Sequence, residues 1–218
     1  MLGPAETLNL RQLVRTFTLR TSEGFVENFG PALIARAGEA APGVRLRFVQ
    51  KPDRESASLR DGTVDLETGV VGKTTGPEVR SRALFHDRFI GVVRNGHPLG
   101  RGEITPARYA TGRHVSVSRH ILGEGPIDEA LKPLGLAREI VTIVTGFSTA
   151  LALARASNLI ASVPERHTGI LRAGMRSFPL PVAIPEITVS LLWHPRLDGD
   201  AAHRWLRGCV REVCEKVR

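Results

Sequence analysis

The 218-residue sequence has no long apolar segment and few cysteines. No stretch of about 18 apolar residues occurs, so no transmembrane helix and no membrane partner are expected. The first residues include Glu6 and no continuous apolar core, which is not the pattern of a signal peptide. Cys209 and Cys214 are five positions apart and would point in different directions on one helix, so free thiols are expected. Free thiols without an export signal predict a cytoplasmic protein.

Motifs of catalysis and of metal binding are also missing. The seven histidines include no pair with the spacing of an H-E-x-x-H helix, so no metal site is predicted. No G-x-S-x-G motif occurs, and no pair of carboxylates stands out as acid and base, so we predict no catalytic residues and no enzyme. Gly72-Lys73-Thr74 lacks the earlier glycine of a phosphate loop, and Gly76-Pro77 forbids the helix that should follow. No cofactor is predicted.

The net charge of +8 comes from 30 basic and 22 acidic residues. A basic chain raises the question of nucleic-acid binding. The basic residues are spread along the whole sequence, however, and no basic cluster is interleaved with aromatic residues. Charge that is dispersed over the surface contributes to solubility and does not mark a binding site. We therefore interpret it as solvated surface and expect no specific DNA binding from these residues.

The apolar and polar residues alternate in a way that predicts an α/β protein. With 42% hydrophobic and 24% charged residues, the composition is that of a globular protein. Strand, helix, strand, helix, strand with short connections occurs twice, which predicts parallel pairing within each cluster. The first cluster covers about 12–90, with strands near 15–22, 44–50 and 63–71. The second covers about 97–180, with strands near 114–118, 138–144 and 158–164 and helices near 125–134, 147–157 and 164–174.

Two further apolar strands, 87–94 and 187–193, connect these clusters. The first ends at Asn95-Gly96-His97-Pro98, which we interpret as the turn where a second domain begins. Two strands that cross between α/β lobes predict a hinge, and a hinge predicts a cleft between the lobes. The last predicted element is a helix over 199–217.

Small polar residues follow several predicted strands. They occur in Thr21-Ser22-Glu23-Gly24, in Lys51-Pro52-Asp53, in Ser116-Val117-Ser118-Arg119 and in the segment 145–149. Free N–H groups at helix starts bind carboxylates, and in open parallel sheets ligands lie at the carboxyl ends of strands. The alternative is that Ser22 and Ser148 are plain helix caps.

Several blocks together resemble the effector-binding domain of LysR-type transcriptional regulators. They are "RTFTLRTSE", "PGVRLRFV", "LRDGTVDLETGVVG", "LFHDRFIGVVRNGHPL", "GPIDEALKPLGL", "LIASVPER" and "LLWHPR", and the resemblance extends from about Arg15 to Cys214. It implies a type II periplasmic-binding-protein-like fold, with two Rossmann-like lobes joined by two crossover strands. Residues 1–14 would be a remnant of a linker. Lobe I would comprise 15–91 and 188–218, lobe II would comprise 92–187, and the hinge strands would be about 87–94 and 187–193.

The resemblance also implies partners. It implies a homodimer, with a tetramer possible for the full-length protein. A stripe on the first helix, Phe25, Phe29 and Leu33, would add apolar surface for the partner, and so would the predicted helix "FSTALALARA" (147–156). DNA would be bound only through an N-terminal winged helix-turn-helix, which these residues do not contain.

The implied function is that of a ligand-sensing regulatory domain, which binds a small carboxylate or aromatic effector in the cleft. Alternatives with the same fold are the solute-binding protein of a transporter and an enzyme such as a dehydratase. The positions implied to contact the effector are Ser22, Glu23, Gly24, Pro52, Asp53, Val70, Ser116, Ser118, Arg119, Gly146, Phe147 and Ser148.

Two of these positions set the expected charge of the ligand. Arg119 is the candidate clamp for a carboxylate, because a guanidinium can donate two parallel hydrogen bonds to it. Glu23 would repel an anion unless it points outward or pairs with an arginine, so a neutral or cationic ligand stays open. Glu67 is expected to be a partly buried acid or to lie on the rim.

Overall fold

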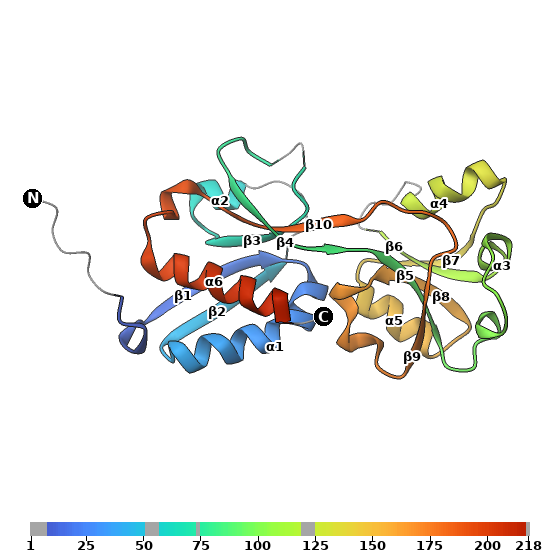
Figure 1. Ribbon diagram of the computed structural model, residues 1–218, viewed down its shortest axis with the longest axis horizontal. Coiled ribbons are helices and arrows are strands. Elements are labelled where there is room, and N and C mark those ends of the chain that lie inside the picture. Colours follow the sequence, from blue (N-terminus) through green and yellow to red (C-terminus); the bar gives the residue numbers. More distant parts are fainter. Residues whose placement is uncertain (1–7, 51–56, 73–74, 119–124, 217–218) are drawn as a thin grey trace, which may run out of the picture. The chain divides into compact units, whose positions relative to one another are not determined.

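The computed structural model describes residues 8–50, 57–72, 75–118 and 125–216. The chain divides into two compact α/β units (Figure 1). Unit 1 comprises Met1–Phe85 and Thr188–Arg218, and unit 2 comprises His86–Ile187. Each unit is built around a five-stranded sheet.

The sheet of unit 1 has parallel and antiparallel strands. In spatial order its strands are β2 (Val44–Gln50), β1 (Arg15–Thr21), β3 (Leu66–Gly69), β10 (Ile187–Trp193) and β4 (Arg80–Asp87). β1 pairs in parallel with β2 and with β3, as the strand–helix–strand pattern predicts. β10 pairs antiparallel with β3, so the sheet is mixed.

Helices cover both faces of this sheet. Phe17 and Leu19 of β1 point to one face, where α1 (Glu23–Ala40) and α6 (Ala201–Lys216) pack on them and bury Phe29 and Leu206 completely. α2 (Ala57–Asp61) packs on the other face through Leu59. Cys209 and Cys214 are both buried free thiols on α6, as the spacing predicted.

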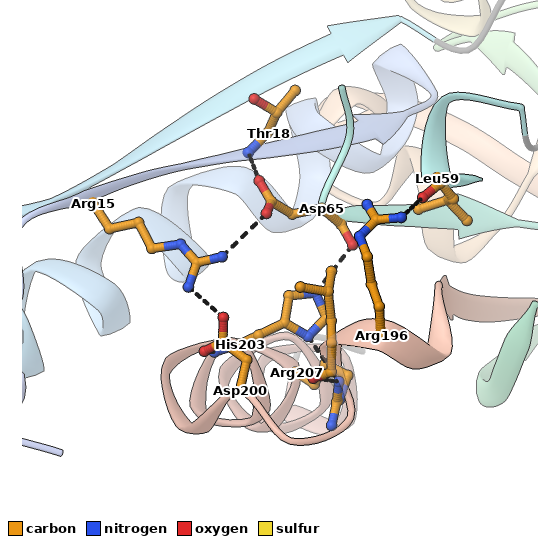
Figure 2. Close-up of polar contacts among 9 residues, drawn as sticks. Arg15, Thr18, Leu59, Asp65, Arg196, Asp200, His203 and Arg207 are labelled. Atoms are coloured by element: carbon orange, nitrogen blue, oxygen red, sulfur yellow. Dashed lines mark hydrogen bonds and ion pairs between the residues drawn. The ribbon is translucent and has the colours of Figure 1, made fainter. Parts of the chain in front are cut away.

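A partly buried polar cluster fixes the start of α6 to the sheet (Figure 2). Arg15 bridges Asp65 and Asp200, and Asp200 accepts a hydrogen bond from the backbone N–H of His203 at the helix start. The Nε2 of His203 lies 3.0 Å from the carbonyl of Asp65, and its Nδ1 lies 2.7 Å from Nη1 of Arg207. A guanidinium can only donate, so Nδ1 is the acceptor and Nε2–H is the donor. Burial, with a contribution from the charge of Arg207, lowers the pKa of His203 and so favours its neutral form.

The sheet of unit 2 is also mixed. In spatial order its strands are β7 (Glu139–Val144), β6 (Arg113–Val117), β8 (Leu159–Pro164), β5 (Phe89–Arg94) and β9 (Met175–Pro179). β6 pairs in parallel with β7 and β8, whereas β5 pairs antiparallel with β8 and β9. The carboxyl ends of the three parallel strands and the start of β5 therefore lie at one edge of the sheet.

The two faces of this sheet have separate cores. Val115 and Ala161 point toward α5 (Phe147–Arg155), which packs on them through Ala150 and Leu151. The opposite face carries Ile160 and contacts α3 and α4. Those elements are α3 (Pro106–Ala110) and α4 (Pro126–Leu131), together with the 3-10 helices η2 (Pro98–Gly100) and η3 (Lys132–Leu134). Alternation along β6 and β8 thus points Ser116 and Ser162 toward the α4 side.

Some sequence predictions differ from the observed elements. Residues 164–174 do not form one helix: they contain the 3-10 helices η4 (Arg166–Thr168) and η5 (Ile170–Arg172), and the chain then turns at Gly174 with φ of 73°. β9 was not predicted at all. The connection between the clusters also differs, since β5 pairs with β8 and β9 from Phe89 and Ile90 onward. The Asn95–Pro98 turn therefore lies inside unit 2 rather than at its beginning, and Gly96 supplies its positive φ of 74°.

Two further 3-10 helices complete the description. They are η1 (Leu10–Gln12) and η6 (Pro195–Leu197), both in unit 1. Among the described residues, none of the helices is both long enough and apolar enough to cross a membrane.

Candidate functional site

A pocket of about 110 Å³ lies within unit 2, at the sheet edge where the parallel strands end. Its walls are mostly apolar, with two hydroxyls and one arginine among them. The residues that line it are Phe89, Val115, Ser116, Val117, Gly125, Pro126, Ile127, Arg138, Phe147, Ser162 and Ile184. A position at the carboxyl ends of parallel strands is the usual one for ligands of open α/β sheets. We call it the unit 2 pocket.

Two helix starts form part of its wall. α5 begins with Gly146 as its N-cap, and Phe147 is the first helical residue and lines the pocket. α4 begins at Pro126, where the missing N–H costs no hydrogen bond. Asp128 accepts a hydrogen bond of 3.0 Å from the N–H of Gly125 and so closes the first turn of α4.

An almost fully buried arginine forms the polar end of the pocket. Only 4% of the Arg138 side chain is exposed, and its Nε and Nη2 each donate a hydrogen bond of 2.8 Å to the carboxylate of Asp128. This bidentate pair neutralises the guanidinium and fixes its plane. Burial works to raise the pKa of Asp128, but the hydrogen bonds and charge of Arg138 outweigh it and hold that pKa below its usual value.

A second polar pair lies beside this arginine. The charge of Arg138 acts on the phenol of Tyr109, and that phenol lies 2.7 Å from the hydroxyl of Ser162. Tyr109 is fully buried, and burial raises its pKa, so the phenol keeps its proton. The ring of His114 packs edge-on against Tyr109 with centroids 4.7 Å apart.

His114 is the buried titratable group of this region. Its Nε2 lies 2.8 Å from the carbonyl of Tyr109, while its Nδ1 is buried without a hydrogen-bond partner among the described residues. Burial, with a contribution from the charge of Arg138, lowers the pKa of His114 to about 4. The imidazole is therefore neutral at physiological pH, with its proton on Nε2.

The predicted contact positions of unit 2 are distributed around this edge. Ser116 and Phe147 line the unit 2 pocket, and Gly146 lies directly before Phe147. Ser118 follows β6 and donates its backbone N–H to the carbonyl of Val144. Ser148 is inside the first turn of α5, so its interpretation as the helix cap is wrong: Gly146 holds that position.

The predicted contact positions of unit 1 gather where β1 passes into α1. Ser22 is the N-cap of α1, since its hydroxyl accepts a hydrogen bond of 3.3 Å from the N–H of Phe25, as the alternative interpretation held. Glu23 accepts a hydrogen bond from the side chain of Gln50 at the end of β2. Gly24 is buried, and Val70 is 40% exposed just after β3. Pro52, Asp53 and Arg119 lie outside the described residues.

Unit 1 also has buried polar side chains at this edge. Glu67 is neither partly buried nor on a rim: it is completely buried and forms an ion pair of 3.0 Å with Arg20, its register partner on β1. On the opposite face the hydroxyls of Thr21 and Thr68 lie 2.6 Å apart. An acid buried beside an arginine explains how a strand can carry Glu67 at a position without exposure.

The sequence did not point to Arg138, Tyr109 or Ser162. Arg138 and Asp128 are ten positions apart, and Tyr109 and Ser162 are 53 apart, so no local motif joins them. The only usable signal was one of polarity: Ser162 interrupts the apolar run "LIASVP". Among the described residues, no group of three or more histidine, cysteine or acidic side chains is placed to hold a metal ion.

Comparison with known proteins adds a family to this geometry. Residues 11–215 match the family model of the LysR substrate binding domain. The chain is 28% identical over 200 residues to the HTH-type transcriptional activator NahR of Pseudomonas putida, which covers 88% of this chain and 65% of that protein. It is 33% identical over 185 residues to the HTH-type transcriptional regulator SyrM of Rhizobium meliloti (strain 1021), which covers 82% of this chain and 55% of SyrM.

A solved structure agrees with the same assignment of fold. A putative transcriptional regulator from Vibrio parahaemolyticus superimposes with a TM-score of 0.81 at 26% identity, covering 95% of this chain and 97% of that one. NahR, SyrM and this structure are all named as regulators of transcription, and none is named as the solute-binding protein of a transporter. The chain spans about 65% of NahR and about 55% of SyrM.

Proposed function

Because the chain belongs to the LysR substrate-binding domain family, we propose that it senses a small organic effector in the unit 2 pocket. The observation that carries this proposal is the mostly apolar pocket with Ser116, Ser162 and Arg138 in its wall. Its volume of about 110 Å³ is comparable with the apolar cavity of about 150 Å³ that holds benzene. A pocket of this size accommodates one ring or a short chain of an effector.

The effector is proposed to be aromatic or to carry a carboxylate. Phe89 and Phe147 supply two aromatic walls, with ring centroids 6.3 Å apart in an edge-on arrangement. Such walls favour a flat apolar group. The hydroxyls of Ser116 and Ser162 offer hydrogen bonds to its polar substituent.

A thermal-shift screen of small aromatic and aliphatic carboxylates tests this proposal. A ligand at about 100 times its dissociation constant adds roughly 2.7 kcal/mol of stability, which is a readily measured rise in melting temperature. Ser116→Phe fills the pocket and should abolish the rise, whereas Ser81→Phe at an exposed position of unit 1 should leave it unchanged. Stabilisation that persists in Ser116→Phe would place the ligand elsewhere.

We further propose that the ligand is bound without chemical conversion. The described residues that line the pocket include no carboxylate, histidine or cysteine, and Arg138 is already paired with Asp128. A general base is therefore not supplied by this wall. Recovery of each screened ligand unchanged after prolonged incubation with the protein is the expected result.

The domain is proposed to act as a homodimer in a longer, cytoplasmic regulator that contacts DNA through another domain. The apolar stripe Phe25, Phe29 and Leu33, one of the two helix faces from which a dimer was predicted, is completely used by the core of unit 1 and cannot meet a partner. The support comes instead from the edge strand β7, where Ile140 and Ile143 are 36% and 59% exposed. An unpaired edge with exposed apolar side chains is a template for association.

Light scattering tests the homodimer. Ile143→Glu should shift the mass toward that of a monomer, because a charge would be buried at the contact. Ile170→Glu is the matched control, since Ile170 is 55% exposed in the same unit but lies away from β7 on η5. A monomeric parent chain at high concentration contradicts the proposal.

A further inference from the structure

We infer that Tyr109 and Ser162 form a hydrogen-bond relay in which the buried phenol holds the hydroxyl of Ser162 as a hydrogen-bond donor into the unit 2 pocket. The pocket then selects effectors whose buried end carries an acceptor oxygen. This inference rests on the proposed function of the pocket and adds the polarity of the group that it recognises. It follows from the direction in which each hydrogen bond must run.

The direction is set by the burial of Tyr109. Its side chain is fully buried, and among the described residues Ser162 is the one hydrogen-bond partner of its phenol. Arg138, whose charge acts on this phenol, has only N–H donors and cannot accept the phenol hydrogen. A buried hydroxyl hydrogen without an acceptor would be costly.

The phenol of Tyr109 is the donor to Ser162 on β8. Because its side chain has no other acceptor among the described residues, its O–H points to the oxygen of Ser162, which lies 2.7 Å away. Tyr109 is fully buried on α3, and Phe178 of β9 and His114 pack edge-on against its ring, so the phenol has one orientation. Ser162 is thus the acceptor of the Tyr109 hydrogen.

Ser162 is left with a hydroxyl hydrogen to donate. Among the described residues, the phenol of Tyr109 is the one hydrogen-bond partner of its side chain. Ser162 is buried on β8, apart from its contribution to the pocket wall. A hydroxyl that accepts a hydrogen bond is polarised by it and becomes a stronger donor. A carbonyl, carboxylate or phenolate oxygen satisfies it, whereas an N–H group does not.

Pairs of probes that differ in one oxygen test the inference. The intact chain is titrated with acetophenone and with ethylbenzene, and binding is followed by NMR shifts of Val115, Ser116 and Phe147. Acetophenone should bind about fivefold or more tightly than ethylbenzene, as expected for one neutral hydrogen bond. Ser162→Ala should bring this ratio close to one by weakening only acetophenone. If Ser162→Ala fails to fold, Ser162→Cys serves, because its S–H is a weak donor.

Tyr109→Phe tests the positioning role of the relay. It should lower the acetophenone to ethylbenzene ratio by about half or more, since the Ser162 hydroxyl is then no longer oriented. A merely structural role would weaken both probes equally and leave the ratio unchanged. Ser177→Ala, at an exposed serine of β9, is the matched control and should retain the parent ratio.

The outcomes separate the inference from the proposed function. Shifts at the three pocket residues with equal affinity for both probes keep the pocket as a binding site and overturn the relay. A parent-like ratio in Ser162→Ala likewise overturns it, because another donor would then be responsible. If neither probe shifts these residues, the pocket is not the effector site, and both proposals are refuted.

Discussion

His114 predicts that unit 2 loses stability in mildly acidic solution. It is completely buried, its Nε2 lies 2.8 Å from the carbonyl of Tyr109, and Arg138 is close enough to disfavour a second positive charge. Protonation would place that charge on Nδ1, which is buried without a partner among the described residues. Protonation of His114 therefore destabilises the part of unit 2 that supports the pocket.

The magnitude follows from the difference between the folded and unfolded pKa. The folded pKa is about 4 and the ordinary value is 6.5. Below pH 6.5 the unfolded chain takes up a proton that the folded chain refuses until about pH 4, so stability falls as the pH falls through this window. Each pH unit inside the window is worth about 1.4 kcal/mol, so the loss between about pH 7.5 and about pH 5 is about 2 kcal/mol.

Urea denaturation at these two pH values measures the loss. The near-ultraviolet signal of Tyr109, the single tyrosine of the sequence, reports on unit 2, while the two tryptophans lie in unit 1. His114→Gln keeps an N–H for the Tyr109 carbonyl and removes the titration, so its loss should be smaller by about 2 kcal/mol. His86→Gln, at an exposed histidine, should behave like the parent. Equal losses in the parent and His114→Gln would refute the reasoning.

Two further predictions concern local contacts. Asp128→Asn leaves the buried charge of Arg138 without its partner and should cost about 3 kcal/mol of unfolding free energy, whereas Glu129→Gln, in an exposed pair with Lys132 on the same helix, should cost under about 0.5 kcal/mol. Equal effects in urea melts would mean that the Asp128–Arg138 pair is not a buried contact. Ser22→Ala removes the N-cap of α1 and should cost about 1 kcal/mol, and Ser148→Ala, inside a helix, should cost less. The reverse order would contradict the assignment of the caps.

The sequence was sufficient for those parts of the fold that have a local cause. Phe17 and Leu19 alternate with polar residues, and both are completely buried on one face of β1. Phe25, Phe29 and Leu33 recur at helical spacing and form the buried stripe of α1. Ser22 and Thr105 precede helices and cap them with their hydroxyls. In each case the cause lies within a few residues of its effect.

The remainder depends on contacts between distant residues. β9 has the burial pattern of an edge strand with a single buried residue, Phe178, which gives too weak a periodicity to recognise. Ser116 and Phe147 were predicted because they follow strands, but Arg138 and Tyr109 became recognisable only when α3, α4 and β8 were in place. The polar end of the pocket is a property of tertiary structure, whereas its position at a sheet edge is a property of the strand–helix order.

Gly91 gives a last test of this tertiary packing. It lies opposite Phe178 in the pairing of β5 with β9, and a methyl group on it would come within 2.2 Å of the Phe178 ring. That ring packs edge-on against Tyr109 with centroids 6.5 Å apart, so it has little room to withdraw. Gly91→Ala should therefore destabilise the protein by about 1–3 kcal/mol through overpacking.

A glycine-to-alanine substitution at an open helical position should have the opposite effect on stability. Gly38 is exposed on α1, and a methyl group there would meet nothing within 4 Å, so Gly38→Ala should stabilise by about 0.5 kcal/mol through helix propensity. Both changes in unfolding free energy are measured from the midpoint of urea denaturation, with the slope of free energy against urea concentration unchanged. If Gly91→Ala proves as stable as the parent, Phe178 does not lie over β5. Tyr109 would then lose one of the two rings that hold its phenol toward Ser162.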